Sequence, residues 1–183
     1  QIIKSNDAYV CTCSQDSISK DRREMTECRC TKQSLEENEK LWHKMFDEKG
    51  FKEGQALLRF RGNMQSGNTT MRDPALFRIN TKRHARQEQK YKVWPTYDFA
   101  GIIFDSISKV SHAMRSKEFE LRKELHHTIL DKLGMEKAEF IFFGRLDLEG
   151  MPVSKSALKP LIENGKVPWY DDPRLPTLEG LRR

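Results

Sequence analysis

The chain has 183 residues, of which 37% are hydrophobic and 33% are charged, and its formal net charge is +6. This length allows a modest core in one or two domains, and the positive charge favours nucleic acid over membrane as the anionic partner. No apolar run reaches membrane-spanning length and the first residues do not resemble a signal peptide, so we expect a soluble, cytoplasmic protein. The chain lacks an initiator Met and ends without a polar tail, so we expect a piece of a longer protein.

The cysteines form two C-x-C pairs, Cys11 with Cys13 and Cys28 with Cys30, on either side of what we expect to be a polar, charged loop. Two close pairs can direct four sulfurs at one ion, which favours a tetrahedral thiolate site for zinc. Free thiols and disulfides are the alternatives, and disulfides are disfavoured in a reducing cytosol. Four protein ligands leave no open position for a substrate, so the zinc would be structural.

Residues 34–49 are predicted to form a helix. Ser34 can cap its first turn together with Glu37, three residues later. The apolar side chains recur at helical spacing and predict one buried stripe. They are Leu35, Leu41, Trp42, Met45 and Phe46.

Three strands are predicted next: one at residues 56–61, a second into which residues 68–79 lead, and a third at residues 91–94 as the return strand of a hairpin. The turn between the last two strands, residues 81–90, carries Lys82, Arg83, His84 and Arg86. Such a basic turn can lie against RNA phosphates and position the RNA without reading its sequence. A merely solvated turn is the alternative.

Residues 97–115 are predicted to form a mostly apolar helix that is buried against a sheet. Its apolar positions are Phe99, Ile102, Ile103, Ile107 and Val110. Tyr97 at the start and Arg115 at the end are polar groups that bracket this buried element. Without further information, Arg115 is equally explained as a helix-end arginine that satisfies terminal carbonyls.

A second helix is predicted over residues 117–133, with Gly134 as its stop. Its apolar side consists of Phe119, Leu121, Leu125, Ile129, Leu130 and Leu133. His126 and His127 are adjacent and therefore point in different directions, which excludes an i, i+4 metal pair between them. No chemistry is assigned to either.

An apolar, aromatic strand is predicted from Phe140 until the break at Gly144. The loop that follows carries Ser154, Lys155 and Ser156, an ammonium between two hydroxyls. Ligands of open α/β sheets bind beyond the carboxyl ends of the strands, so this loop is a candidate phosphate site. A solvated surface loop is the alternative.

These segments together resemble a known family. The stretch from Val153 to Ser156 resembles the KMSKS loop of class I aminoacyl-tRNA synthetases, although Pro152 replaces the first consensus Lys. Four further blocks resemble glutamyl-tRNA synthetases of the archaeal or eukaryotic type, and they occur in that family's order. The blocks are Met71-Arg72-Asp73-Pro74 with Leu76-Phe77-Arg78-Ile79, Trp94-Pro95-Thr96-Tyr97-Asp98-Phe99, Phe143-Gly144-Arg145-Leu146, and the segment 169–183.

The resemblance implies an α/β chain built from the second half of a split class I Rossmann nucleotide-binding fold plus an α+β insertion. Residues 1–94 would be the insertion that binds the acceptor end of tRNA, with a zinc knuckle at about 9–32, as related glutamyl enzymes can carry. Residues 95–150 would be the second Rossmann half. Residues 151–183 would hold the KMSKS-like loop and the start of the stem-contact region.

The resemblance also implies roles for residues of the amino-acid pocket. Tyr97 matches a position whose hydroxyl holds the amino acid. Arg115 matches the pocket position that separates glutamate from glutamine enzymes, where a guanidinium suits a side-chain carboxylate. An amide in that pocket would leave the cation without a counter-charge, at a cost of several kcal/mol. Arg115 is the main reason to predict glutamate as the substrate.

On the ATP side, the resemblance places Ser116 at the ribose and Arg145 with the Leu146 backbone at adenine. Val153, Ser154 and Lys155 would meet the phosphates. The resemblance gives Lys155, with Ser154, the catalytic role of stabilising charge on pyrophosphate as the glutamate carboxylate attacks the α-phosphate. Mg²⁺ would accompany ATP, and no carboxylate cluster identifies its ligands.

The implied parent enzyme is a glutamate–tRNA ligase that uses ATP, L-glutamate and tRNA(Glu), with tRNA(Gln) as a further substrate left open. The family's HIGH motif would precede Gln1 and the anticodon-binding region would follow Arg183, so the chain alone is predicted to be inactive. The alternatives are a glutaminyl-tRNA synthetase of the same architecture and a non-catalytic zinc-containing RNA-binding protein.

Overall fold

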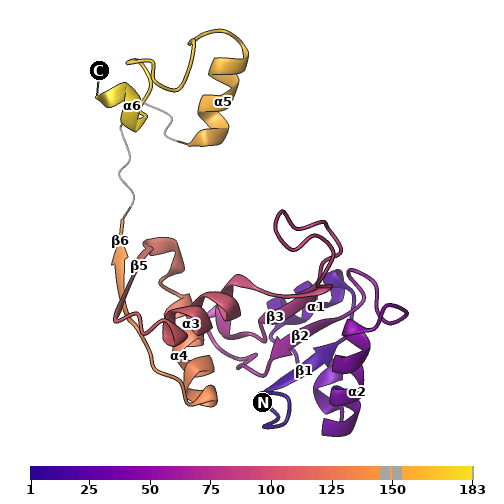
Figure 1. The fold of residues 1–183 in the computed structure, drawn as a ribbon. Helices are drawn as coiled ribbons and strands as arrows, with labels where there is room; N and C mark the ends of the chain where they lie inside the picture. The colour runs from indigo at the N-terminus through magenta and orange to yellow at the C-terminus, as the bar shows by residue number, and fades with distance from the viewer. Residues whose placement is uncertain (145–148, 150–153, 183) are drawn as a thin grey trace. The chain divides into compact units, whose positions relative to one another are not determined.

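The computed structural model describes residues 1–144, 149 and 154–182, and the chain divides into two compact units, Gln1–Phe143 and Gly144–Arg183 (Figure 1). Each unit has buried apolar side chains of its own. Among the described residues, no helix has the length and apolar character needed to cross a bilayer.

The first unit contains a four-stranded antiparallel sheet with the strand order β1-β2-β3-β4. Its strands are β1 (Ala8–Cys11), β2 (Leu57–Phe60), β3 (Ala75–Ile79) and β4 (Val93–Pro95). The predicted hairpin is confirmed as β3 and β4, and the strand predicted at 56–61 is confirmed as β2. Strand β1, which is fully buried, was not predicted.

Two helices and two short 3-10 turns accompany this sheet: α1 (Gln15–Glu24), η1 (Arg29–Lys32), α2 (Leu35–Phe46) and η2 (Thr69–Met71). The predicted capping box of α2 is confirmed, because Ser34 and Glu37 each accept a hydrogen bond from the other's backbone N–H. Met45 is buried, whereas Leu35 and Phe46, at the helix ends, are exposed.

The prediction of a loop between the two cysteine pairs is wrong, because helix α1 occupies most of that segment. Ser14 caps this helix by accepting a hydrogen bond from Ser17 N, and Met25 ends it in the left-handed conformation. Asp16 in the first turn and arginines in the last turn complement the helix dipole. The helix buries no residue completely, but Ile18 packs against the cysteine cluster and Arg22 Nη2 donates to Thr69 O.

The remainder of the first unit consists of α3 (Tyr97–Ile107), β5 (His112–Ser116), η3 (Lys117–Phe119), α4 (Arg122–Leu133) and β6 (Glu139–Phe143). Strands β5 and β6 pair in parallel. Strand β6 confirms the predicted aromatic strand. Gly134 ends α4 at a φ of 64°, as predicted, although the regular helix begins only at Arg122.

The single helix predicted over 97–115 is wrong. Helix α3 ends at Ile107, Lys109 adopts a φ of 54°, and the chain continues as strand β5. A positive φ interrupts the helix, and pairing with β6 then satisfies the backbone groups of residues 112–116. Ile107, predicted to be buried, is 68% exposed, whereas Ile102 is 1% exposed.

One hydrophobic core joins the sheet to this second part. It unites Val10 and Leu58 of the sheet with Ile102 of α3, Leu125 of α4 and Phe140 of β6. The predicted boundary at residue 94 therefore runs through a shared core, and the functional division at that point stays a prediction.

The second unit contains α5 (Lys155–Glu163) and α6 (Leu178–Leu181). Leu158, Val167 and Leu175 form its small core. Lys155, which was predicted to lie in a loop, is the first residue of helix α5. The helix begins there because Ser154 caps it by accepting a hydrogen bond from Ala157 N.

Candidate active site and metal centre

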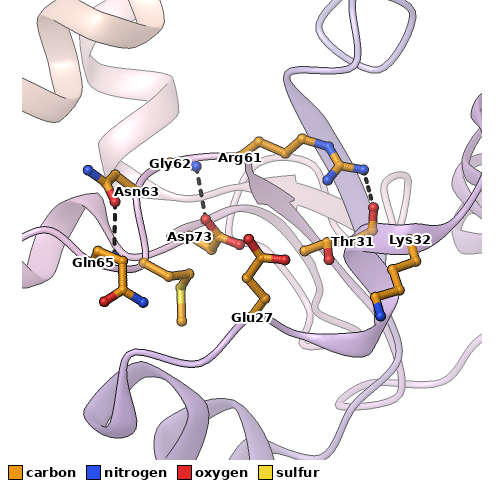
Figure 2. A pocket seen from close by; sticks show the side chains of 9 residues that line it. Glu27, Thr31, Lys32, Arg61, Gly62, Asn63, Gln65 and Asp73 are labelled. Atoms are coloured by element: carbon orange, nitrogen blue, oxygen red, sulfur yellow. Dashed lines mark hydrogen bonds between the residues drawn. The ribbon is translucent and has the colours of Figure 1, made fainter.

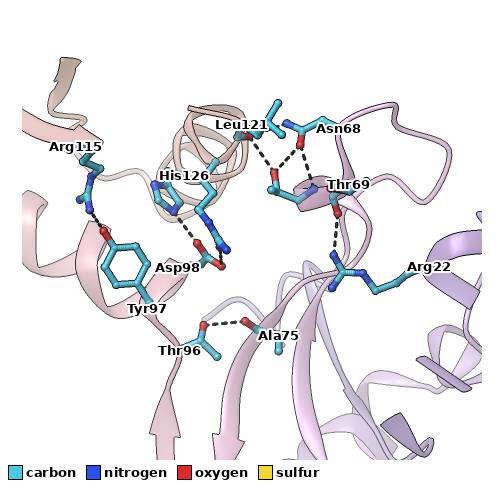
Figure 3. Close-up of polar contacts among 12 residues, drawn as sticks. Arg22, Asn68, Thr69, Ala75, Thr96, Tyr97, Asp98, Arg115, Leu121 and His126 are labelled. Carbon is cyan, nitrogen blue, oxygen red and sulfur yellow. Dashed lines mark hydrogen bonds and ion pairs between the residues drawn. The ribbon is translucent and has the colours of Figure 1, made fainter. Parts of the chain in front are cut away.

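Arg115 and Tyr97 lie together, as the prediction of a shared pocket requires. Arg115 Nη1 donates to the Tyr97 hydroxyl (Figure 3). Arg115 Nη2 donates to Asp105 Oδ2 at 2.6 Å. Tyr97 and Asp105 belong to α3, two repeats of four residues apart and therefore on one side of that helix. Arg115 reaches this side from strand β5.

The Arg115 guanidinium is also held between two aromatic rings. Its carbon lies 5.2 Å from the ring centre of Phe140 and 5.6 Å from that of Tyr97. The side chain is 13% exposed, and its Nε has no hydrogen-bond partner. The helix-end alternative for Arg115 is wrong, since the residue lies in a strand and donates to side chains.

A buried polar cluster lies one residue further along α3. Asp98 accepts hydrogen bonds from Arg122 and from His126 Nε2, the latter at 3.1 Å (Figure 3). Burial disfavours the Asp98 carboxylate, but the bonds from His126 and Arg122 outweigh it and leave the pKa of Asp98 below its usual value. Arg122 and His126 are an i, i+4 pair on α4, so His126 has a polar role that the sequence analysis missed.

Ser116, the predicted ribose contact, is the last residue of β5. It pairs with Phe143 of β6, while Arg115 pairs with Phe142. Both residues therefore stand at the carboxyl ends of parallel strands, the usual place for ligands in α/β sheets.

The predicted phosphate-contacting residues belong to the second unit. Ser154 is the N-cap of α5 and its Oγ lies 3.2 Å from that of Ser156. Lys155 is exposed in the first turn of the helix. Arg145, Leu146 and Val153 lie outside the described residues.

The basic turn between β3 and β4 is exposed throughout residues 81–90 and projects from the sheet (Figure 1). Arg83 pairs with Glu88 at 2.8 Å. His84 stacks on Trp94 with ring centres 5.0 Å apart and accepts from the backbone N–H of Arg86. His84 thus has a structural task in shaping the turn, while Lys82 and Arg86 extend into solvent.

All four cysteines are buried, unpaired by disulfides and close together. The Sγ atoms lie 3.6 Å apart in Cys11 and Cys28, 3.6 Å in Cys13 and Cys28, and 3.8 Å in Cys13 and Cys30. All the sulfurs lie within 4.8 Å of one another. The disulfide alternative does not describe this arrangement, because bonded sulfurs are about 2 Å apart.

The cysteine spacing fits a tetrahedral metal centre. With Zn–S bonds of about 2.3 Å, the sulfurs of a tetrahedral site are about 3.8 Å apart, close to the separations seen here. The cluster is formed where β1, the start of α1 and the η1 turn meet. A group of four cysteines of this kind is suited to zinc and has no position left for a substrate.

A hollow lies beside this cluster, between η1 and the loop that follows β2. Glu27, Thr31, Arg61 and Asp73 are among its lining residues (Figure 2). Arg61 Nη2 donates to Thr31 O at 2.7 Å, and Gly62 N donates to Asp73 Oδ1 at 2.9 Å. The first bond links the cysteine-bearing segment to the loop 61–73, and the second closes that loop on itself.

Asp98, Asp105 and His126 were not assigned roles from the sequence. Asp105 could have been found from its position, because Tyr97, Gly101 and Asp105 follow the helical repeat of one face. The pairing of Asp98 with α4 has no such local indication, since His126 is 28 residues away.

Comparison with known proteins gives consistent results. Residues 1–183 match the family described as tRNA synthetases class I (E and Q), catalytic domain. The chain is 55% identical to the glutamate–tRNA ligase of Cenarchaeum symbiosum and 56% identical to that of Nitrosopumilus maritimus, in both cases over 100% of this chain. It spans 32% of the length of these relatives.

A solved structure shares the fold. It is the crystal structure of a glutamate tRNA ligase from Elizabethkingia meningosepticum, which matches with a TM-score of 0.54 at 18% sequence identity. The match covers 87% of this chain and 34% of that chain.

Proposed function

This chain belongs to the family of class I tRNA synthetase catalytic domains for glutamate and glutamine, and from that membership we propose that it is part of a glutamate–tRNA ligase. The proposed activity is the ATP-dependent activation of L-glutamate and its transfer to the 3′ end of tRNA(Glu). The observation that carries the proposal is the Arg115 guanidinium, held by Tyr97 and Asp105 on one side of α3.

Arg115 is proposed to bind the side-chain carboxylate of glutamate, and Tyr97 to position the amino acid. A planar guanidinium matches a carboxylate through two parallel charge-assisted hydrogen bonds. Asp105 and the Phe140 ring restrict the Arg115 side chain, so little rotamer freedom remains to be lost on binding. Asp105 already balances part of the guanidinium charge, so glutamine is disfavoured because its neutral amide cannot form the two charge-assisted hydrogen bonds that a carboxylate gains here.

The ATP site is proposed to combine Ser116 with Arg145, Leu146, Val153, Ser154 and Lys155. During activation, a carboxylate oxygen of glutamate forms a bond to the α-phosphorus and the bond to pyrophosphate breaks. Lys155 is proposed to stabilise the charge that pyrophosphate gains, with Ser154 beside it. The described residues show no carboxylate group of the kind that holds Mg²⁺, and their one metal-competent cluster is the four cysteines.

The four cysteines are proposed to hold a structural zinc ion. Their separations and their burial support this assignment. When bound, the ion would cross-link β1, α1 and η1 and thereby stabilise the fold of residues 9–32.

The exposed turn with Lys82, Arg83 and Arg86 is proposed to contact the phosphates of the tRNA acceptor end. Its exposure and its projection from the sheet support this role. Residues 1–94 are proposed to form the acceptor-binding portion, 95–150 the second Rossmann half and 151–183 the start of the stem-contact region. The cytoplasmic location and the use of tRNA(Gln) stay predictions.

Aminoacylation by the full-length protein tests the proposal. Radiolabelled glutamate and glutamine are offered in parallel with total tRNA and ATP, and we expect label in tRNA from glutamate. Label from glutamine alone would identify the sister enzyme and leave Arg115 a structural residue. No label from either would favour a non-catalytic RNA-binding protein.

A further inference from the structure

A completely buried arginine lies next to the cysteine cluster. Arg59 of β2 is 0% exposed and is the largest of the fully buried side chains. Its Nε donates to Asp73 O at 2.8 Å, but neither Nη1 nor Nη2 has a hydrogen-bond partner. A guanidinium is always charged in proteins, and a buried charge without acceptors is strongly unfavourable.

The nearby carboxylate of Asp73 does not accept hydrogen bonds from Arg59 Nη1 or Nη2. Asp73 is buried too, but its Oδ2 accepts from the Tyr9 hydroxyl at 2.8 Å and its Oδ1 accepts from Gly62 N. The face of the Tyr9 ring accommodates the guanidinium carbon at 5.6 Å without accepting its N–H groups. The Nη donors of Arg59 therefore have no hydrogen-bond partner among the oxygen atoms that surround them.

The register of the sheet indicates where that acceptor lies. Arg59 is directly opposite Tyr9 in the antiparallel pair, and Cys11 is two residues beyond Tyr9 on the same face of β1. Long side chains reach such diagonal positions. Arg59 and Cys13 also line one common cavity, so the guanidinium lies beside the sulfur cluster.

We propose that Arg59 is the internal counter-charge of the metal–thiolate centre and donates its free Nη hydrogens to the thiolate of Cys11. Four thiolates around a divalent ion carry a net charge of two minus, and N–H donors to the sulfurs are the usual means of stabilising it. This inference rests on the proposed metal site.

A second arginine offers an internal comparison. Arg29, between the ligands Cys28 and Cys30, lines a hollow together with Cys13, but its side chain is exposed to solvent. A hydrogen bond with the Cys13 side chain raises the pKa of the Arg29 guanidinium. Water screens an exposed cation, so we expect Arg29 to contribute less to the centre than Arg59.

The arrangement couples the metal to the loop 61–73. Arg59 Nε holds the Asp73 carbonyl, and Asp73 adopts a φ of 44°, which is unfavourable for a residue with a side chain. Gly62 packs so tightly here that a Cβ would lie 1.9 Å from Met71 O. The bonds from Arg59 and Tyr9 thus hold a strained loop in place next to the cysteines.

The test measures metal affinity in the full-length protein. Zn²⁺ affinity is determined by competition with a chelator, and Co²⁺ substitution reports the thiolate ligands through their charge-transfer absorption. Cys11→Ser identifies the signal of this centre. Arg59→Met, of similar length but neutral, is expected to lower Zn²⁺ affinity by roughly 10–100-fold and to shift the Co²⁺ absorption.

Three further variants make the result specific. Arg59→Lys keeps the charge but loses the planar donors, so its loss should be intermediate. Arg72→Met is the matched control, because Arg72 is also buried but donates to the carbonyls of Ser66 and Arg22. Arg72→Met should retain affinity within about threefold of the unmodified protein, and the exposed Arg29→Met should lose less affinity than Arg59→Met. Unchanged affinity in Arg59→Met, or an equal loss in Arg72→Met, would overturn the proposal.

A measurement on the unmodified protein does not depend on whether a variant folds. Removal of the metal by chelation should accelerate amide hydrogen exchange in the loop 61–73 before it affects α4. An unchanged loop would contradict the role of Arg59. If the unmodified protein binds no metal, the proposed metal site itself is wrong, which is a separate result.

Discussion

At the scale of single residues, the chemistry of Arg115 depends on what surrounds it. Tyr97 and Asp105 fix two of its nitrogens, and Phe140 lies against its plane. A carboxylate ligand that reaches this guanidinium gains two charge-assisted hydrogen bonds in a partly desolvated site. The proposed substrate preference therefore depends on Arg115 together with Tyr97, Asp105 and Phe140, and not on the arginine alone.

Arg115→Ala in the full-length protein should lower kcat/KM for glutamate by roughly 100-fold or more, because the carboxylate would lose its only proposed counter-charge. Asp105→Ala should cost about tenfold, since it acts only by orienting Arg115. The double variant should be no worse than Arg115→Ala. Steady-state ATP–pyrophosphate exchange measures kcat/KM for glutamate in all three variants.

Two outcomes would contradict this account. Additive losses in the double variant would give Asp105 a role independent of Arg115. Unchanged glutamate kinetics in Arg115→Ala would remove the reason for choosing glutamate over glutamine. Arg23→Ala, at an exposed position in the last turn of α1, is the control for nonspecific effects of removing a positive charge.

At the scale of elements, the packing of α3 against α4 is fixed by one polar cluster. Asp98 on α3 binds both Arg122 and His126 on α4, and the His126 ring also contacts Phe140 of β6. Asp98 directly follows Tyr97 in the chain. The cluster therefore sets the position of the helix end that carries the predicted amino-acid contact.

Asp98→Asn should destabilise the first unit by about 2 kcal/mol at pH 7, because the partly buried bonds from Arg122 and His126 lose their charged acceptor. The folded-state pKa of Asp98 is below its usual value, so its stabilisation is complete above the unfolded value of about 3.9 and is lost as pH falls through the folded pKa. Urea unfolding from pH 7 to pH 3 should show the deficit of the variant shrinking only below about pH 4.

A control for this effect is available on helix α4. Asp131 pairs with Lys137, but its side chain is 61% exposed. Asp131→Asn should change stability by less than about 0.5 kcal/mol at any pH. A deficit in Asp98→Asn that persists unchanged to pH 3 would show that the carboxylate charge is not what stabilises the pair.

At the scale of the whole molecule, the chain combines a large unit that has a continuous core with a small second unit. Arg115 belongs to the first unit and Lys155 to the second. The chain spans 32% of the length of its relatives, and its sequence contains no HIGH motif.

The 183-residue chain by itself should therefore fold and bind metal but show no glutamate-dependent ATP–pyrophosphate exchange. The full-length protein, assayed in parallel, should show exchange. Circular dichroism and metal content verify that the isolated chain is folded during the assay. Exchange above background by the isolated chain would contradict the prediction.

The sequence alone identified the family correctly, since motifs in the right order led to the class I synthetases and residues 1–183 match that family. It also predicted the local features well. The capping box at Ser34 and the helix stop at Gly134 depend on residues only a few positions apart, so local sequence determines them.

Only the tertiary structure decided the setting of the site. The strand at Arg115 forms because β6 pairs with it from about 27 positions further along the chain, and no helical repeat within 97–115 contains that information. The partners of Asp98 and the burial of Arg59 likewise depend on contacts between distant elements. The sequence by itself determined which chemical groups are present and where several helices begin and end. Long-range packing decided which of these groups meet. The reason is that burial and strand pairing depend on contacts between segments that no local sequence pattern connects.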